Sequence, residues 1–188
     1  MRLIIGITGA TGSIFGIRLL EVLRDMQVET HLVLSAWGQK NIEIETNYSV
    51  DEVKKLASVV HDERNQAASI SSGSFHTDGM IIAPCSMTTL AHIAHGLADN
   101  LVQRAADVVI KERRKLILMP RETPLSPIHL QNMLTLSQMG VQIVPPMPAF
   151  YNRPQSLDDM VNHVVGKALD LFRLPHRLYE PWRPEPED

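Results

Sequence analysis

Short hydroxyl side chains recur where apolar runs of the sequence end. Ser35 follows "HLVL", the segment "SMTT" (86–89) follows "MIIAPC", and Thr11 lies in the glycine-rich segment "TGATGS" (8–13) after "RLIIGI". Serine and threonine hydroxyls donate hydrogen bonds to phosphate oxygens, and backbone N–H groups at the start of a helix attract an anion. The three segments therefore predict a site for the phosphate and the ribose or ribityl arm of a mononucleotide.

The elements that must position these segments alternate along the chain. Apolar runs predict strands, and apolar residues at helical spacing fill the intervals between them. The predicted strands are 2–7, 29–35, 79–86, 115–120 and 141–146. The predicted helices are 13–26, 36–46, 49–59, 88–96, 100–114, 126–140 and 156–172. Residues 67–74 have the composition of a loop.

This alternation predicts an α/β fold with a single doubly wound domain of the Rossmann-like, flavodoxin-like kind. Such a domain has a parallel sheet with helices on both faces, and it binds ligands at the carboxyl ends of its strands. The domain is expected to span residues 1–174, followed by a C-terminal tail at 175–188. Since the hydroxyl-rich segments all follow predicted strands, the fold would gather them at one edge of the sheet.

The bulk composition disfavours several classes of protein. The 188 residues include 18 basic and 21 acidic side chains, a net charge of −3, so we expect no nucleic-acid partner. No apolar run reaches the roughly 18 residues of a membrane span, and no signal peptide is expected. The one cysteine, Cys85, allows no intramolecular disulfide, which favours a cytoplasmic location. We expect Cys85 to be a buried small hydrophobe.

A nicotinamide enzyme of the short-chain type is one alternative, because its turn has the pattern T-G-A-T-G-x-x-G. The acidic residue that would hold a ribose about 20 residues further on is missing, since the second strand ends in Ser35, Ala36 and Trp37. The residues four positions after the three tyrosines are glutamate, glutamine and arginine, so there is no Tyr-x-x-x-Lys pair. These features disfavour the dinucleotide interpretation.

Longer motifs accompany the glycine turn. They are "GITGATGSIFGIRLL", "HLVLS", "ASISSGSF", "PCSMTTL", "RAADVVIKERR", "LMPRETPLS", "HLQNM" and "PAFYNRPQS". With them the chain closely resembles the UbiX/Pad family of flavin prenyltransferases along nearly its whole length. The resemblance implies transfer of a dimethylallyl group from dimethylallyl monophosphate to N5 of reduced FMN, with ring closure onto C6. It also implies that no metal is used, that a UbiD-type decarboxylase receives the prenyl-FMN, and that the chain forms a homo-oligomer, typically a dodecamer.

The resemblance further implies which residues bind the two substrates. Those expected at FMN are Gly9, Ala10, Thr11, Ser35, Ser86, Met87, Thr88, Thr89 and Arg121. Those expected at the allylic phosphate are Lys111, Arg121, Glu122, Tyr151 and Lys167. Breaking an allylic C–O bond releases phosphate, so without a metal the cationic side chains must neutralise it.

Four residues are assigned to catalysis by the same resemblance. Glu122 would handle a proton near flavin N5, because a neighbouring phosphate favours the protonated carboxyl group. Glu45 would help in the ring-closing step. Lys111 would neutralise the leaving phosphate, and Tyr151 would donate a hydrogen bond to it.

The chain departs from the common family pattern at three of these positions. Thr11 stands where serine is frequent, and Thr88 where lysine or glycine is frequent. Lys167 stands where arginine is common, so the bidentate grip of a guanidinium on phosphate is lost there. These departures bear on substrate detail and rate more than on the fold.

Two other functions stay open, and both would use FMN. One is a non-catalytic FMN-binding subunit or carrier for a phenolic-acid decarboxylase, and the other is a flavin decarboxylase of the phosphopantothenoylcysteine type. The histidine that the second would need early in the chain is represented by His31, which falls inside a predicted strand. A metal is not expected, because Asp158 and Asp159 fit helix-capping acids and His92 and His95 lack a third ligand.

Overall fold

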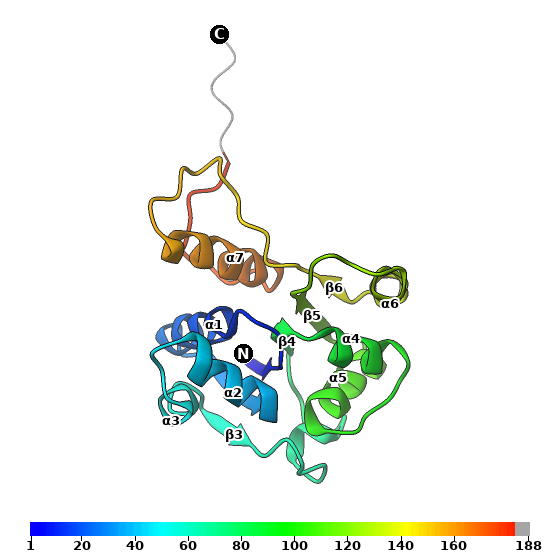
Figure 1. The fold of residues 1–188 in the computed structure, drawn as a ribbon. Coiled ribbons are helices and arrows are strands. Elements are labelled where there is room, and N and C mark those ends of the chain that lie inside the picture. The colour runs from blue at the N-terminus through cyan, green and yellow to red at the C-terminus, as the bar shows by residue number, and fades with distance from the viewer. Residues whose placement is uncertain (183–188) are drawn as a thin grey trace. The chain divides into compact units, whose positions relative to one another are not determined.

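The apolar runs of the sequence form a parallel β-sheet in the computed structural model, which describes residues 1–182 (Figure 1). Its strands are β1 (Arg2–Ile7), β2 (Glu29–Leu34), β3 (Val59–His61), β4 (Gly79–Cys85), β5 (Lys115–Pro120) and β6 (Gln142–Ile143). They lie in the order β3-β2-β1-β4-β5-β6, and every neighbouring pair is parallel. All seven residues of β4 are buried, as expected for a central strand covered on both faces.

The direction in which strands are added reverses between β1 and β4. From β1 the chain adds β2 and β3 on one side, and from β4 it adds β5 and β6 on the other. In a doubly wound sheet this reversal opens a crevice at the carboxyl ends of the two central strands. The strand order confirms the predicted α/β fold and places the hydroxyl-rich segments after β2 and β4 at the same edge.

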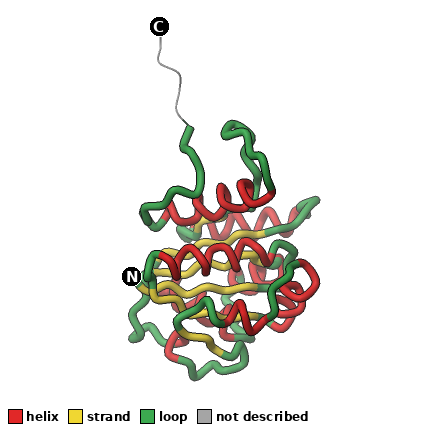
Figure 2. The backbone as a smooth tube through the Cα atoms, turned by 90° about the vertical axis from the view of Figure 1, so that its left-hand side faces the viewer, coloured by secondary structure: helices red, strands yellow, loops and turns green. Residues whose placement is uncertain are grey.

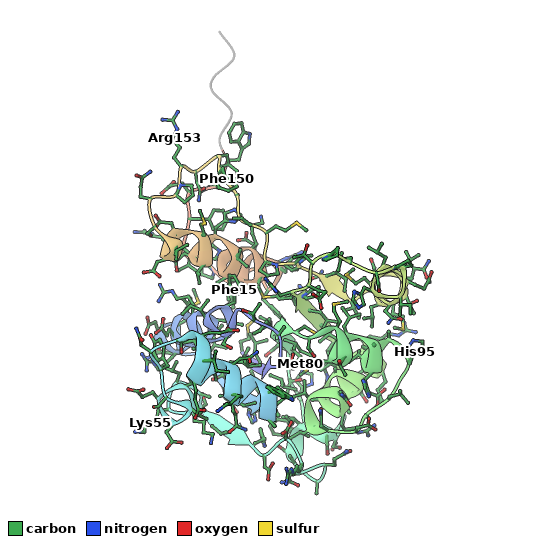
Figure 3. All side chains as sticks on the ribbon, in the orientation of Figure 1. Phe15, Lys55, Met80, His95, Phe150 and Arg153 are labelled. Carbon is green, nitrogen blue, oxygen red and sulfur yellow. The ribbon has the colours of Figure 1, made fainter. Side chains whose placement is uncertain are left out.

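Within Met1–Pro145, helices lie on both sides of the strands (Figure 2). They are α1 (Ser13–Asp25), α2 (Ala36–Glu45), α3 (Val50–Lys54), the short 3-10 helix η1 (Ser69–Ser71), α4 (Met87–Ala94), α5 (Leu101–Lys111) and α6 (Pro127–Gln138). Helix α7 (Leu157–Leu171) comes later in the chain. Helices α4, α5 and α6 share one apolar core with the sheet, in which Met80 of β4 is fully buried (Figure 3). Helix α1 packs against β1, β2 and β4.

Most helix boundaries follow from capping side chains that are visible in the sequence. Six helices begin after a residue whose side-chain oxygen accepts a hydrogen bond from a backbone N–H in the first turn. These N-cap residues are Ser35, Ser49, Ser86, Asn100, Ser126 and Ser156. The capping box predicted for Ser156 and Asp159 is present, which confirms a capping role for Asp159.

The structure differs from the predicted elements in its short segments. The helix predicted over 49–59 ends at Lys54, and β3 (Val59–His61) was not predicted. Two valines and a histidine are too short a run to predict a strand, and pairing with β2 determines this one. The strand predicted over 141–146 is only Gln142–Ile143, and η1 interrupts the loop predicted over 67–74.

Residues from Pro146 onward form a second compact unit, and Met1–Pro145 form the first. In the second unit, α7 is followed by a chain segment that folds back along it: a Cβ atom on Gly166 would lie 2.7 Å from the ring of Tyr179. The domain boundary at residue 174 stays a prediction, and residues 183–188 of the predicted tail lie outside the described residues.

Candidate functional site

A cavity of about 420 Å³ lies at the carboxyl ends of the central strands, within the first unit. Its lining residues are Gly9, Ser35, Ala36, Trp37, Glu63, Ser86, Thr88, Thr89, Asn100 and Gln103. Gly9, Ser35, Ser86, Thr88 and Thr89 were all predicted from the sequence to bind FMN. The structure therefore brings together segments that are up to about 80 residues apart in the chain, as a parallel sheet does at its carboxyl edge.

Three helices begin at this cavity. Ser35 caps α2, Ser86 caps α4 and Asn100 caps α5, with N–H donors at 3.0, 3.2 and 3.0 Å. The first N–H groups of a helix have no intrahelical partner, and the helix dipole makes that end positive. Convergence of three such ends, with the hydroxyls of Thr88 and Thr89, makes the cavity suited to an anion such as a phosphate group.

One carboxylate also borders the cavity. Glu63 Oε1 accepts a hydrogen bond from the backbone N–H of Ala36 at 2.8 Å, at the first turn of α2. Glu63 follows the unpredicted strand β3, and no local pattern in the sequence indicated its position. Among the lining residues that were not predicted, only Asn100 had a usable signal, since asparagine before an apolar helical run is a common N-cap.

The start of α1 is occupied by a side chain of the protein itself. Glu45 Oε2 accepts hydrogen bonds from the backbone N–H groups of Gly12 and Ser13, at 2.8 and 3.0 Å. The expectation that the N–H groups of this glycine turn meet a bound anion is therefore wrong for these two residues. The helix starts that border the cavity are those of α2, α4 and α5 instead. At two of them the first N–H group is also engaged within the chain, because the N–H groups of Ala36 and Leu101 donate to Glu63.

The same contacts set the ionisation of Glu45. Burial alone would raise the pKa of this carboxyl group, but hydrogen bonds from Thr11 and from the amides of Ser13 and Gly12 outweigh burial and lower it. Glu45 is therefore a carboxylate at neutral pH. Thr11 and Ala10 are tied to α2 as well, because the carbonyl oxygen of Ala10 accepts a hydrogen bond from Asn41 at 3.0 Å.

Gly9 allows the turn after β1 to approach the first turn of α2. A Cβ atom at Gly9 would lie 2.6 Å from Cβ of Trp37, closer than two carbon atoms can approach. Trp37 itself is 69% exposed and borders the cavity. A glycine is thus required here by a tertiary contact rather than by a positive φ angle.

Arg121 and Glu122 follow β5 at the same edge of the sheet. Cys85 at the end of β4 is paired in register with Pro120, so Arg121 comes directly after the strand that neighbours the Ser86 segment. Both side chains are exposed, and the carboxylate of Glu122 accepts a hydrogen bond from the backbone N–H of Thr123 at 3.0 Å. Their position fits an expected role beside the cavity.

Lys111 lies at the other end of the strands, near the point where β5 begins. It is the last residue of α5, whose 11 residues after the cap Asn100 span about 16 Å of helix. Its ammonium group forms an ion pair with Glu112, just before the chain enters β5 at Lys115. Within one chain the structure does not bring Lys111 to the cavity that Asn100 lines.

A larger cavity, of about 730 Å³, also lies at this end of the strands, where β5 and β6 begin. It is lined by Ile110, Arg113, Arg114, Lys115, Leu116, Met139, Gly140, Val141 and Gln142. It contains no helix N-terminus and no serine or threonine, and Arg114 is engaged by the carbonyl oxygens of Gly73 and Phe75. The smaller cavity is therefore the candidate site.

The second unit contains Tyr151 and Lys167, the other two residues expected to bind the allylic phosphate. The hydroxyl of Tyr151 is 3.1 Å from Nε2 of His163 on α7. Burial, followed by the charge of Lys167, lowers the pKa of His163, so the ring is neutral at pH 7. Lys167 Nζ lies 3.4 Å from both Asp170 Oδ2 and the hydroxyl oxygen of Tyr179.

The surroundings of His163 assign its proton. Its Nδ1 atom is buried and has no hydrogen-bond partner within residues 1–182. A buried N–H group without a partner is rarer than a buried acceptor without one, so we place the proton on Nε2, where it is donated to the Tyr151 oxygen. The hydroxyl hydrogen of Tyr151 is then available to a ligand.

Other sequence predictions can be tested directly. Cys85 is fully buried, and burial raises the pKa of its thiol far above the usual range, which confirms the prediction of a buried small hydrophobe. His92 contacts Asp99 and the carbonyl oxygen of Thr88. Across residues 1–182 no three side chains of the metal-binding types are grouped closely enough to hold a metal ion. None of the helices in that range combines the length and hydrophobicity of a membrane span.

Comparison with known proteins shows which family the chain resembles. The Flavoprotein family model matches residues 1–169. A curated protein of Streptomyces sp. (strain D7), named a probable UbiX-like flavin prenyltransferase, is 64% identical over 183 residues, which are 97% of this chain and 92% of that protein.

Two solved structures superimpose closely on the chain. One is a dodecameric FMN-dependent UbiX-like decarboxylase from Escherichia coli O157:H7, with a TM-score of 0.97, 60% identity, and coverage of 98% of this chain and all of that one. The other is AnUbiX (PadA1) in complex with FMN and dimethylallyl pyrophosphate, with a TM-score of 0.97, 49% identity, and coverage of 98% of both chains.

Proposed function

The chain belongs to the Flavoprotein family and, within it, to the UbiX-like flavin prenyltransferases, and from this premise we propose how its residues perform the reaction. The chain is an enzyme that transfers a dimethylallyl group to FMN. Dimethylallyl monophosphate is the proposed donor, and reduced FMN supplies the N5 and C6 positions at which the new bonds form. The observation that carries the proposal is the cavity at which α2, α4 and α5 all begin.

The residues of this cavity fit the phosphate end of FMN. We propose that its phosphate accepts hydrogen bonds from the first N–H groups of α4, at Met87 and Thr88, and from the hydroxyls of Ser86 and Thr89. Charge favours this arrangement, because the positive ends of three helices outweigh the one carboxylate, Glu63, which is already engaged by an N–H group. The rest of the flavin-binding surface is proposed to be lined by Gly9, Ala10, Thr11 and Ser35. Arg121 is proposed to reach the flavin side of FMN.

Departure of the donor's phosphate requires positive charge and hydrogen-bond donors. We propose that the cationic side chains of Arg121 and Lys167 neutralise phosphate charge. Tyr151 donates its hydroxyl hydrogen, which the neighbouring His163 leaves free. Glu122 is the proposed proton-handling group, and its exposed carboxyl needs no rearrangement of a buried contact to accept or release a proton.

Glu45 is proposed to act more through structure than through proton transfer. Its three hydrogen-bonding partners keep it ionised and hold the glycine turn against α2. An ionised carboxylate can accept the proton that ring closure releases, although a lowered pKa makes it a weak base. We therefore propose that Glu45 contributes to ring closure mainly by holding the turn that carries Gly9 and Thr11.

The position of Lys111 supports a site completed between copies of the chain. A relative that is 60% identical over nearly the whole chain is dodecameric, and we propose that this chain also assembles as a homo-oligomer. Lys111, at the edge of the sheet opposite the cavity of its own chain, would then neutralise phosphate in a neighbouring copy. A UbiD-type decarboxylase as recipient of the product, and a cytoplasmic location, stay predictions.

One of the two alternative functions finds less support in the geometry. A decarboxylase of the phosphopantothenoylcysteine type would need a reactive histidine early in the chain, but His31 is 4% exposed and engaged by His61 and Glu29 at 2.9 and 3.0 Å. A non-catalytic FMN carrier would use the same cavity. The two functions differ in turnover alone.

The test is anaerobic mixing of the purified chain with reduced FMN and dimethylallyl monophosphate, followed by mass spectrometry of the released flavin. We expect a mass gain of one dimethylallyl group. Unchanged FMN that stays bound would reject the transferase proposal in favour of the carrier. Parallel reactions with the pyrophosphate donor would decide which phosphate the site accepts.

A further inference from the structure

Lys167 belongs to a three-membered contact within the second unit. The hydroxyl of Tyr179 donates a hydrogen bond to Asp170 Oδ2 at 2.5 Å. Lys167 Nζ lies 3.4 Å from that same carboxylate oxygen and 3.4 Å from the Tyr179 oxygen. The ammonium group therefore faces two oxygen acceptors that are themselves joined by a short hydrogen bond.

The local sequence builds this contact rigidly. Lys167 and Asp170 are three residues apart on α7, so their side chains leave the same side of the helix. The second oxygen of Asp170 lies 3.0 Å from Nε2 of His176, which also lies 3.0 Å from the carbonyl oxygen of Gly166. The absence of a side chain at Gly166 lets His176 and Tyr179 pack against α7. Both oxygens of Asp170 are thus held by the segment that returns along the helix.

A lysine needs such support more than most side chains. Its ammonium sits on a flexible four-carbon stem, and fixing that stem costs rotamer entropy. Two acceptors engage two of its three N–H donors and leave one for a ligand oxygen. The side chain is still 53% exposed, so the third donor can be reached from solvent.

The same contacts keep the ammonium charged. Burial alone would lower the pKa of Lys167, but the hydrogen bond with Tyr179 and the charge of Asp170 outweigh burial and raise it. Tyr179 also contacts the support of the other donor-binding residue, because its ring centroid is 4.7 Å from that of His163, the partner of Tyr151. The side chain of Tyr179 therefore contacts Lys167 directly and also contacts His163, the hydrogen-bond partner of Tyr151. Lys167 and Tyr151 are the two residues of this unit that are proposed to bind the donor phosphate.

We propose that Tyr179 and Asp170 are positioning residues that hold the Lys167 ammonium group ready for the phosphate of the allylic donor. The inference rests on the proposed function for the role of Lys167 and extends it to two residues outside every motif used above. Tyr179 and Asp170 do not touch the reacting atoms. They act on affinity for the donor, through Lys167, and not on the chemical step.

The opposing interpretation is an ordinary surface ion pair, which contributes little to stability and nothing to the reaction. Under that interpretation, removing the Tyr179 hydroxyl would affect only folding. A third interpretation is that Asp170 competes with phosphate for Lys167. Removing the Tyr179 hydroxyl or the Asp170 charge would then strengthen donor binding.

The experiment uses Tyr179→Phe, which keeps the ring against Gly166 and His163 and removes only the hydroxyl. Tyr48→Phe is the matched control, because the Tyr48 hydroxyl donates a similar hydrogen bond to Glu21 at 2.7 Å and Tyr48 is not among the proposed substrate contacts. Asp170→Asn is a second variant that keeps acceptor capacity but removes the charge. Thermal unfolding establishes that each variant is folded.

Two readouts are taken on FMN-loaded protein. Steady-state kinetics without oxygen gives KM and kcat for dimethylallyl monophosphate, and calorimetric titration of the oxidised form gives the donor Kd without turnover. We expect Tyr179→Phe to raise KM and Kd roughly three- to tenfold, with kcat and FMN affinity within about twofold of the starting protein. We expect Tyr48→Phe to change neither KM nor Kd.

A double-mutant cycle with Lys167→Ala decides whether the effect passes through Lys167. If Tyr179 acts by positioning that ammonium, Tyr179→Phe adds nothing to donor Kd once Lys167 is removed. Additive losses, an unchanged Kd in Tyr179→Phe, or tighter binding in Asp170→Asn would each overturn the inference. Donor binding without turnover in the starting protein would instead reject the transferase proposal, while the Kd cycle would still decide the inference.

Discussion

The carboxylate of Glu45, the last residue of α2, accepts a hydrogen bond from the backbone N–H of Gly12 at the start of α1, at 2.8 Å. The end of one helix thereby caps the beginning of another, 33 residues earlier in the chain. The glycine turn that resembles a phosphate-binding loop carries an internal anion at this point. Its N–H groups at Gly12 and Ser13 are therefore engaged within the chain.

Replacing Glu45 by glutamine should destabilise the fold. The amide keeps the shape but loses the charge that the α1 N–H groups favour, and because the carboxylate is largely exposed we expect a loss of about 1 kcal/mol in the free energy of unfolding. The folded pKa is below the usual 4.5, so this stabilisation is present above about pH 4.5 and is lost as the pH falls through the folded pKa. Urea unfolding at pH 7 and pH 4 measures both effects. Glu43→Gln on the same helix, whose carboxylate is 3.7 Å from Lys40, is the control that should change little.

Replacing Ser86 by alanine should weaken FMN binding as well as stability. The substitution removes the N-cap of α4, which costs about 1 kcal/mol, and it removes a proposed phosphate donor, which should raise the FMN Kd roughly tenfold. Ser49→Ala removes the cap of α3, outside the cavity, with a hydrogen bond of the same length. Equal stability losses with a changed FMN Kd only in Ser86→Ala would support the site. Flavin fluorescence titration gives the Kd, and equal Kd values would contradict the assignment.

Variants of Lys111 and Glu122 should restore each other's activity when mixed. Each of Lys111→Ala and Glu122→Gln should lower kcat/KM by about 100-fold or more, because each removes a proposed charge or proton-handling group. If Lys111 serves a neighbouring copy, a random mixture of the two variants should contain roughly a quarter of sites with both groups intact. The measurement is prenyl-FMN formation after the two proteins are unfolded and refolded together. Activity no higher than that of either variant alone would show that both groups belong to a site within one chain.

The first unit should lose stability in mild acid because of His61. Burial, followed by the charge of His31, lowers the pKa of His61 from its usual 6.5, so the folded state disfavours protonation. The stabilisation is thus present above about pH 6.5 and is lost as the pH falls toward the folded pKa. Unfolding free energies at pH 7.5 and 5.5 should fall less in His61→Gln than in the starting protein. Since Glu29 and His31 share this network, an equal fall in both proteins would assign the acid sensitivity to those groups instead.

Several features of the fold could be predicted because their causes are local. The runs that became β1, β2, β4 and β5 each contain at least three consecutive apolar residues, and a serine or asparagine marks the start of six helices. Alternation of such elements leaves few arrangements other than a parallel sheet. Since every strand then points its carboxyl end the same way, Ser35 and the Ser86 segment were correctly expected to share one edge.

The remaining features depend on contacts between distant residues. Strand β3 exists because β2 offers it an edge, and Glu63 reaches the cavity because β3 ends beside it. Motif matching assigned Lys111 to a phosphate, but the length and direction of α5 place it away from the cavity of its own chain.

Local patterns were enough to predict β1, β2, β4 and β5, most helix starts and the family, since these depend on residues near one another in the chain and on long motifs. Which helix starts already carry a partner from within the chain became known only from the folded arrangement. Whether a given N–H group meets a substrate depends on which carboxylate already occupies it, and for α1 that carboxylate, Glu45, is more than 30 residues away.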